Sequence, residues 1–319
     1  MKKIMALILA TVLIASALVF TGCTGEENKV YNIGICQLVT HDALDAATQG
    51  FKDAVEEGLG KDNVVFNEQN AAGEANTCTT IVNDFVSKNV DLIMANATPA
   101  LQAAANSTVD IPILGTSITE YGVALEIKDF NGTVGGNVSG TSDLAPLEEQ
   151  AQMILDIVPD AKEVGIIYCS AEANSAYQVK KVKEFLEGKD ITVKEFPFSA
   201  SSDVAQVAEA ATACDAIYIP TDNTAASCTE TINNVVLPTK TPIIAGEEGI
   251  CKGCGVATLS ISYYELGKKT GEMAVEILKD GKDISTMAIA YDENPVKKYN
   301  PTICKELGIK APKGFEKMK

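Results

Sequence analysis

The sequence predicts an α/β protein built from two doubly wound parallel-sheet lobes that are joined by a hinge. After residue 29, short apolar runs alternate with amphipathic stretches of helical period, an order typical of parallel sheets with helices on both faces. The pattern starts again after a Gly- and Asn-rich segment at 131–140, which we interpret as a crossover or hinge. A chain of 319 residues is also long for one domain, since domains of about 100–150 residues are the commonest.

Strands and helices are expected to alternate through the first half. The helix at 42–59 is the clearest, because Leu44, Ala47, Phe51 and Val55 recur at steps of three and four residues. The other helices expected here are 76–88 and a short one from Thr98, and the expected strands are 30–38, 64–68, 91–95 and 111–115.

The second half repeats this order without evident sequence identity to the first. Its expected helices are 147–158, 175–186, 203–211 and 225–236, and its expected strands are 163–168, 191–196, 216–220 and 242–245. A last helix at 263–279, a strand near 286–291 and a Lys-rich tail end the chain. We therefore expect two lobes of the same build.

The first residues are typical of an export signal. Two lysines precede an apolar run at 4–20, and small residues come before Cys23, as in a bacterial lipoprotein signal. Phe20 departs from that pattern, which usually has Leu there. We expect 1–22 to be a lipoprotein signal peptide, Cys23 to be the lipidated (palmitate-bearing) first residue, and 23–29 to be a lipid-anchored tether. An uncleaved membrane anchor is the alternative, although the run is marginal for a bilayer span of about 20 residues.

The charge and composition narrow the possible ligands. The formal net charge is −17, which disfavours nucleic acid as a partner. All 26 basic residues are Lys, and the sequence has neither Arg nor Trp. Without a guanidinium fork, a ligand carboxylate would have to be held by backbone N–H groups, hydroxyls or a Lys.

The cysteines do not form a recognisable metal motif. Cys36, Cys169 and Cys214 lie in or beside strand-like runs, and we interpret them as small buried hydrophobic residues. Cys251 and Cys254 form one C-x-x-C pair, for which a local disulfide and two free thiols are both open. The sequence has no second C-x-x-C and a single His, so we expect no metal site.

The candidate site consists of polar residues that follow the expected strands. Ligands of open parallel sheets bind outside the carboxyl ends of the strands. The ligand-binding candidates are Thr40, His41, Thr98, Ser117, Thr119, Glu120, Asn174, Ser175, Thr221, Asp222, Asn223 and Glu247, with Glu172 and Glu248 at the same rims. Any one of them is equally well placed to cap a helix, since Ser, Thr, Asp and Asn favour that position.

An enzymatic function is disfavoured. Carboxylates at Asp222, Glu247 and Glu248 with Lys252 nearby would suit acid–base chemistry, but neither a nucleophile elbow nor a phosphate loop is present. We therefore expect a binding protein that uses no cofactor.

The residues from about 30 to 290 are similar to the tryptophan/tyrosine-type substrate-binding lipoproteins of ABC transporters. The resemblance rests on the segments 34–57, 98–103 (TPALQA), 172–180 (EANSAYQVK), 219–224 (IPTDNT) and 261–282. Two departures stand out: Glu120 occupies a position where the family has Asp, and the Cys251–Cys254 pair lies in a stretch usually free of cysteine.

This resemblance implies a type I periplasmic binding protein-like fold, in which a three-crossover hinge joins the lobes. It assigns 30–141 plus 258–283 to the N-terminal lobe and 142–257 plus 284–319 to the C-terminal lobe. The last helix would then return to the first lobe and the last strand to the second.

The resemblance also implies a function. We expect the extracellular solute-binding component of an ABC importer, which binds a free aromatic amino acid (tryptophan, tyrosine or phenylalanine) in the interlobe cleft. It would be a monomer, lipid-anchored on the extracytoplasmic face of a bacterial cell membrane, working with permease and ATPase subunits. The alternatives are another amino acid or small solute, and a surface interaction (adhesin-like) protein.

Roles for the candidate residues follow from the chemistry of an amino acid. We expect Asp222 to accept from the ligand ammonium, unless it only caps the following helix. Thr98 and Ser175, at helix starts, are candidates for the ligand carboxylate, and Asn174 and Asn223 would add amide contacts. The side chain would need an apolar slot, and Glu120 or His41 would meet a phenol or indole group. The slot candidates are Leu38, Tyr121 and Tyr177.

Overall fold

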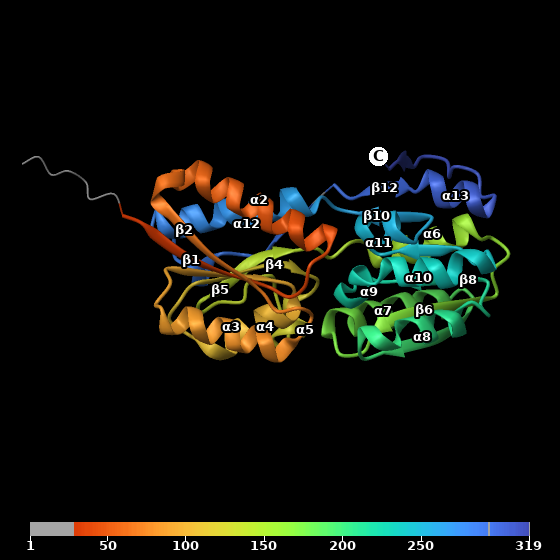
Figure 1. Cartoon of the computed structure of the whole chain (residues 1–319), viewed down its shortest axis with the longest axis horizontal. Helices are drawn as coiled ribbons and strands as arrows, with labels where there is room; N and C mark the ends of the chain where they lie inside the picture. The colour runs from red at the N-terminus through yellow and green to blue at the C-terminus, as the bar shows by residue number, and fades with distance from the viewer. Residues whose placement is uncertain (1–28, 293, 319) are drawn as a thin grey trace, which may run out of the picture. The chain divides into compact units, whose positions relative to one another are not determined.

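The computed structural model describes residues 29–292 and 294–318. The compact unit that begins at Tyr31 contains two β-sheets, each with helices on both faces (Figure 1). The predicted signal peptide and Cys23 lie outside the described residues. Within the described part of the chain, the structure contains no helix that combines the length and apolar character needed to cross a bilayer.

The first sheet is parallel throughout and has the strand order β11-β5-β4-β3-β1-β2. Its strands are β1 (Tyr31–Gln37), β2 (Val64–Asn70), β3 (Leu92–Asn96), β4 (Ile113–Ile118), β5 (Val138–Ser142) and β11 (Ala290–Tyr291). We call this sheet with its helices the first lobe.

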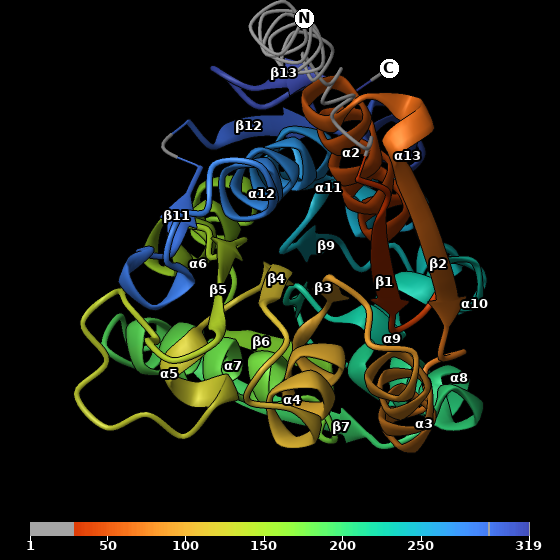
Figure 2. The same ribbon diagram turned by 90° about the vertical axis from the view of Figure 1, so that its left-hand side faces the viewer.

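Helices cover both faces of the first sheet (Figure 2). The helices α2 (Asp42–Leu59) and α12 (Tyr263–Leu278) lie together on one face, and α3 (Ala75–Ser87), α4 (Thr98–Ser107) and α5 (Tyr121–Ala124) lie on the other. Side chains of β1 alternate between the two cores, as the period of two in a strand requires. Ile33 and Ile35 pack in the core beneath α2 and α12, whereas Cys36 packs in the core beneath α3 and α4.

The second sheet has the strand order β13-β12-β10-β9-β8-β6-β7 and is parallel except between β10 and β12. Its strands are β6 (Glu163–Cys169), β7 (Thr192–Phe198), β8 (Ala216–Ile219), β9 (Ile243–Ala245), β10 (Ala257–Ser260), β12 (Val296–Tyr299) and β13 (Glu316–Lys317). We call this sheet with its helices the second lobe.

The second lobe also has two cores. One contains side chains of α6 (Leu147–Ile157), α7 (Ala173–Glu187) and α13 (Pro301–Leu307). The other contains side chains of α8 (Val204–Ala211), α9 (Asn223–Ser227), α10 (Thr229–Val236) and α11 (Glu248–Gly253). Four short 3-10 turns, η1 (Lys61–Asn63), η2 (Ser201–Asp203), η3 (Leu237–Thr239) and η4 (Ile284–Thr286), complete the described elements.

Three segments connect the two sheets, as the three-crossover expectation requires: from β5 to α6, from β10 to α12 and from β11 to β12. Their positions correct the predicted lobe boundaries in three places. Ser142, assigned to the second lobe, is the last residue of β5 and pairs with β4 and β11 of the first sheet. The residues 258–260, assigned to the first lobe, belong to β10, which pairs with β9 of the second sheet. The residues 284–291, assigned to the second lobe, include β11, which pairs with β5 of the first sheet.

Local patterns explain these differences. The Gly- and Asn-rich segment 131–140 was interpreted as a crossover, but it leads directly into β5, and the first crossover follows at 143–146. The predicted helix 225–236 is two helices, α9 and α10, separated at Cys228. The Lys-rich tail forms β12, α13 and β13.

The cysteine predictions can be compared directly with the structure. Cys36, Cys169 and Cys214 are buried, as expected. Cys251 and Cys254 are both buried free thiols, so the structure contains the second of the two states that the sequence left open.

Two glycines set the close approach of α2 and α12. A Cβ atom on Gly267 would lie 1.9 Å from the carbonyl oxygen of Ala47, and one on Gly50 would lie 2.0 Å from the carbonyl oxygen of Tyr264. Real Cβ contacts do not occur at such distances, so each helix needs glycine where the other helix crosses it. This crossing fixes α12, and with it Tyr263 at its first turn, against the first lobe.

We predict that Gly267→Ala lowers the free energy of unfolding by about 1–3 kcal/mol, because the helices must separate to admit the methyl group. Urea denaturation of the purified protein measures this. Lys269→Ala, at an exposed position of the same helix, is the control and should change it by less than about 0.5 kcal/mol. Equal stability of the two variants would contradict the account of the crossing.

Candidate functional site

The carboxyl ends of the first sheet hold several of the predicted residues. His41 occupies the N-cap position of α2 without a side-chain capping hydrogen bond, and Thr98 begins α4. Ser117 lies near the end of β4, and Thr119 follows that strand. Thr98, Ser117 and Thr119 are buried, whereas Thr40 is exposed and accepts a hydrogen bond from Asn70. The backbone of Ser117 is in the left-handed region, with φ of 56°, a conformation that costs energy for a non-glycine residue.

In the second lobe, Glu172 organises the corresponding rim. Its Oε2 accepts from the backbone N–H and the side-chain amide of Asn223, at 3.2 and 2.6 Å. Its Oε1 accepts from the backbone N–H and the hydroxyl of Thr224, at 2.9 and 2.8 Å. The amide of Asn174 also donates to Oε2, at 3.3 Å. This carboxylate is therefore occupied by the ends of α7 and α9.

Asp222 is a buried helix cap. Its Oδ1 accepts from the backbone N–H of Ala225 at 2.8 Å and its Oδ2 from the backbone N–H of Cys169 at 2.6 Å. The hydroxyl of Ser175 also hydrogen-bonds this carboxyl. Burial, followed by the charge of Glu172, raises the pKa of Asp222 to about 7. The capping alternative that the sequence left open is thus what the structure contains, and both oxygens are already engaged.

Two further predicted carboxylates cap helices as well. Glu247 accepts from the backbone N–H groups of Gly249, at 2.6 Å, and of Ile250, and burial raises its pKa to about 7. Glu120 accepts from the backbone N–H groups at the start of α5. Most of the acidic residues that follow the strands therefore cap helices. This is expected, because the first turn of a helix has free N–H groups and a positive dipole end that favour acidic side chains.

A buried acidic residue that the sequence analysis did not select lies in the first crossover. Asp143 follows β5 directly and is 4% exposed. Its Oδ2 accepts a hydrogen bond of 2.9 Å from the phenol of Tyr263, whereas its Oδ1 has no hydrogen-bond partner. Burial raises the pKa of Asp143 to about 6, although the hydroxyls of Tyr263 and Thr119 lower it.

Tyr263 links Asp143 to the second lobe. Its phenol is buried, which raises its pKa, whereas the nearby Thr221 side chain lowers it. Asn174 in turn donates to the backbone carbonyl of Thr221 at 3.2 Å. Thr119 and Asp143, then Tyr263 and Thr221, and finally Asn174 therefore form a set of neighbouring polar residues from the first lobe to the second. We refer to these five residues as the polar cluster.

Several buried polar atoms at the strand ends have no hydrogen-bond partner in the described part of the chain. Five of them lie in the last two positions of a strand, in the segment after it or in the first turn of the next helix: His41 Nδ1, Asn96 Oδ1, Ser117 Oγ, Asp143 Oδ1 and Asn174 Oδ1. Buried polar groups are normally paired, because an unpaired one costs about 1–3 kcal/mol. Four of these atoms follow or end strands of the first lobe and one, Asn174 Oδ1, lies at the start of α7 in the second lobe. Unpaired atoms at the carboxyl ends of strands are what a binding site for a polar molecule requires.

The predicted residues His41 and Asn223 come together from the two lobes. The Nε2 of His41 lies 3.4 Å from Asn223 Oδ1. Burial lowers the pKa of His41, while the hydrogen bond to Asn223 opposes that shift. A neutral ring at neutral pH is the consequence, so His41 can donate or accept but adds no positive charge to the site.

Two cavities take walls from both lobes, and His41 lines the first of them. One, of about 370 Å³, is bordered by Thr40, His41 and Asp42 on the first lobe and by Ser227, Thr229 and Lys252 on the second. The other, of about 270 Å³, is bordered by Leu38, Pro99, Glu172 and Thr224 among others. Both cavities take their walls from segments that follow strands, which agrees with the position predicted for the site.

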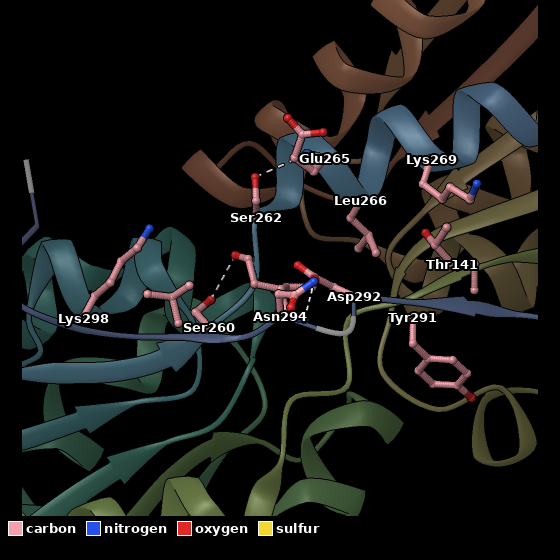
Figure 3. A pocket seen from close by; sticks show the side chains of 13 residues that line it. Thr141, Ser260, Ser262, Glu265, Leu266, Lys269, Tyr291, Asp292, Asn294 and Lys298 are labelled. Atoms are coloured by element: carbon pink, nitrogen blue, oxygen red, sulfur yellow. Dashed lines mark hydrogen bonds between the residues drawn. The ribbon is translucent and has the colours of Figure 1, made fainter. Parts of the chain in front are cut away.

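A further cavity, of about 480 Å³, borders the second and third crossovers (Figure 3). Glu265, Leu266 and Lys269 line it from α12, and Figure 3 shows the Leu266 side chain pointing down from this helix, the Glu265 carboxylate pointing up, and the Tyr291 ring pointing down, away from the helix. Lys269 pairs with Glu272 at 3.1 Å, and Lys298 pairs with Glu248 at 2.6 Å. Since both lysines already pair with carboxylates, this cavity offers a small molecule fewer unpaired polar groups than the strand ends do.

The residues suggested for an apolar slot are dispersed. Tyr121 is buried in the first-lobe core, and its phenol donates to the carbonyls of Gly115 and Thr141. Leu38 borders the 270 Å³ cavity, and Tyr177 borders a different one beside α6. Of these three, Leu38 is the one placed near the strand ends of both lobes.

The sequence analysis missed Asn96, Asp143 and Tyr263. Asn96 directly follows the strand expected at 91–95 and was not selected there; in the structure it is the last residue of β3. Asp143 follows a strand that was interpreted as a crossover, and Tyr263 was counted only as the start of a helix. A search for polar residues around every expected crossover would have found Asp143. In the residues that the structure describes, His, Cys, Asp and Glu side chains form no cluster suited to a metal ion.

Comparisons with known proteins bear on this site. A family model described as ABC transporter substrate binding protein matches residues 32–317. A tyrosine-binding protein of Clostridioides difficile (strain R20291) is 38% identical over 312 residues, which cover 92% of this chain and 89% of that protein.

Two solved structures are also similar. An ABC domain from Streptococcus pneumonia in complex with L-Trp superposes with a TM-score of 0.86 at 31% identity, covering 91% of this chain and 100% of that one. The ligand-free, open structure of a substrate binding protein with adhesive properties from Clostridium difficile has a TM-score of 0.68 at 37% identity, covering 91% and 99%.

We predict that Asp222→Ala acts through the fold, lowering the free energy of unfolding by about 2–3 kcal/mol, because two buried N–H groups lose their acceptor. Thermal or urea unfolding measures the loss. Asp283→Ala, which removes an exposed cap from η4, is the matched control and should cost less than about 1 kcal/mol. A fully stable Asp222→Ala protein would contradict the capping role.

We also predict that the ligand-free protein is more stable at about pH 5.5 than at about pH 7.5. The pKa values of Asp143, Asp222 and Glu247 are raised in the folded state, to about 6, 7 and 7. The folded protein therefore binds more protons than the unfolded chain between about pH 4 and 7, and the free energy of unfolding falls as pH rises through that window. His41 has the opposite effect, because its lowered pKa means that the folded protein binds fewer protons there than the unfolded chain does. It contributes at most one proton, whereas the three carboxyl groups contribute up to three. Melting temperatures that rise from pH 5.5 to 7.5 would contradict the prediction.

Proposed function

Because the chain belongs to the family of ABC transporter substrate-binding proteins, we propose that it is the solute receptor of an ABC importer and that its solute is a free aromatic amino acid. The observation that carries this proposal is the set of buried, unpaired polar atoms at the carboxyl ends of the two sheets. A solute bound there would supply the partners that the protein lacks.

The chemistry of these atoms favours a solute that donates hydrogen bonds. Asn96 Oδ1, Asn174 Oδ1 and Asp143 Oδ1 can accept but not donate while the carboxyl group is ionised. An ammonium group, with a phenol or indole N–H, would supply such donors. Ser117 Oγ can donate to a carboxylate, in agreement with a chain that has no Arg for this task.

The relatives support an aromatic amino acid. One is named for binding tyrosine, and the structure of another contains L-Trp. Tryptophan, tyrosine and phenylalanine share the zwitterion and differ in the polar group on the ring, so the same unpaired atoms would serve all three. His41, near Asn223, is our candidate for the phenol or indole group, and Leu38 for the apolar wall.

In this proposal the protein binds its solute without changing it chemically and without a cofactor. As a monomer, it delivers the solute to permease and ATPase subunits. Its lipidated Cys23 would hold it at the extracytoplasmic face of the bacterial cell membrane, with 1–22 removed as a signal peptide. The described unit from Tyr31 onward would then be connected to the anchor by a short polar tether.

A surface interaction is the second candidate function, and one observation favours it. A relative with 37% identity is described as a substrate binding protein with adhesive properties. An anchored, strongly acidic protein would display its surface to other cells or to a matrix, and solute binding would not prevent this.

We predict that the protein without its first 23 residues is stabilised by one or more of tryptophan, tyrosine and phenylalanine. The protein is unfolded and refolded to remove any bound ligand, and its melting temperature is measured with each of the twenty amino acids and common sugars. A ligand at about 1,000 times its Kd adds about 4 kcal/mol to the free energy of unfolding, a shift of several degrees. A folded protein that responds to a sugar or to none of the panel would contradict the proposed solute.

We predict that Cys23→Ser releases the protein from the membrane when the full chain is expressed in a bacterium that lipidates exported proteins. The expected result is loss of labelled palmitate and of partitioning into a detergent phase, because the thiol that carries the lipid is absent. Cys228→Ser, at a partly buried cysteine of the second lobe, is the control and should stay membrane-bound. An unlabelled wild-type protein retained in the membrane would favour an uncleaved anchor instead.

A further inference from the structure

Four carboxyl groups are buried in the described part of the chain, and one of them differs from the rest. Glu172, Asp222 and Glu247 each accept backbone N–H groups on both oxygens. Asp143 uses only Oδ2, and its Oδ1 has no partner although the residue is 4% exposed. Among these four buried carboxyl groups, Asp143 is therefore the one with an oxygen that accepts no hydrogen bond.

Hydroxyl groups, which carry no charge, hydrogen-bond or adjoin the Asp143 carboxyl group. The phenol of Tyr263, from α12, and the hydroxyl of Thr119, from the segment after β4, lower its pKa, and the charge of Asp143 in turn raises the pKa of the Tyr121 phenol, from α5. A buried carboxylate that is held only by hydroxyls is costly, because burial removes hydration that hydroxyls replace incompletely. A cation placed at Oδ1 would offset that cost and make a charge-assisted hydrogen bond.

We propose that Asp143 binds the ammonium group of the solute through Oδ1, and that Tyr263 is the positioning residue that orients its carboxylate. This inference rests on the proposed function and assigns the residue that selects for the α-amino group. It replaces Asp222, whose two oxygens are occupied by the N–H groups of Ala225 and Cys169.

The position of the pair connects the solute to the hinge. Asp143 lies in the first crossover, and Tyr263 begins α12, directly after the second crossover. The hydrogen bond between them therefore joins two of the three segments that connect the sheets. An ammonium group bound at Oδ1 would keep the carboxyl group ionised and so strengthen its hydrogen bond with the Tyr263 phenol.

The chain contains a matched pair for comparison. Tyr264, the next residue of α12, also donates its phenol to a carboxylate, Asp53 of α2, and at the same distance of 2.9 Å. Tyr264 and Asp53 are both exposed or half-buried and lie on the outer side of the first lobe. Tyr264→Phe and Asp53→Asn therefore make the same chemical changes as Tyr263→Phe and Asp143→Asn, but at a pair that lies away from the strand ends.

The test compares an amino acid with its des-amino analogue. Calorimetry measures the Kd of wild type and of Asp143→Asn for L-tyrosine with 3-(4-hydroxyphenyl)propionate, for L-tryptophan with indole-3-propionate, or for L-phenylalanine with 3-phenylpropionate, according to which amino acid binds. We expect Asp143→Asn to weaken binding of the amino acid by about 100-fold or more, because a buried charge pair loses one partner. The analogue, which has no ammonium, should bind the variant at least as well as wild type.

Tyr263→Phe has its own readout. The phenol lowers the pKa of Asp143, so its removal should raise that pKa and shift the acid limb of amino-acid binding to higher pH. A merely structural role for Tyr263 would weaken binding at all pH values without moving the midpoint. Tyr264→Phe and Asp53→Asn should leave both the Kd and its pH dependence unchanged.

The outcomes are distinguishable. If Asp143→Asn weakens binding of the amino acid and of its analogue equally, Asp143 does not bind the ammonium. The same conclusion follows if the substitution weakens binding of neither. If wild type binds no aromatic amino acid at all, the proposed function fails instead.

Should Asp143→Asn fail to fold, Asp143→Glu keeps the charge and displaces it by one methylene. The inference then predicts a loss of at least about 10-fold for the amino acid and none for the analogue, and equal losses for both would overturn it.

Discussion

The structure depends on how a buried carboxyl group is accommodated where the two lobes connect. Asp143 sits in the first crossover, and the phenol of Tyr263, from the start of α12, holds one of its oxygens. The close crossing of α12 over α2, which requires Gly50 and Gly267, fixes the position of that phenol. Packing in the first lobe thus determines the orientation of a charged group between the lobes, and that group is left with one oxygen for a further donor.

Parallel sheets explain why so many polar side chains gather here and why few of them are available. The strands of each lobe end at one edge, and each is followed by a helix whose first N–H groups need acceptors. Glu120, Asp222 and Glu247 supply those acceptors, so they serve the fold first. The side chains left unpaired, such as Ser117 and Asn174, are the ones that a solute would meet.

Much of the fold could be predicted from the sequence because helical periodicity is strong where one face is buried. The helix expected at 42–59 is α2 with the same bounds, and that expected at 263–279 ends one residue earlier. Short strands such as β10 and β11 were misplaced or missed, since four or two residues carry too little pattern to show which sheet they join. The same limit applies to the site. A sequence shows that Asp222 and Asp143 are acidic, but only the fold shows that one caps a helix and the other keeps an unpaired oxygen.

The most direct measurement is a crystal structure of the protein with the amino acid that stabilises it most. The account predicts the solute at the strand ends of both lobes, with its ammonium nitrogen about 2.7–2.9 Å from Asp143 Oδ1 and the Tyr263 phenol still on Oδ2. An ammonium group bound to another carboxylate, or a solute in the cavity beside the second and third crossovers, would contradict it.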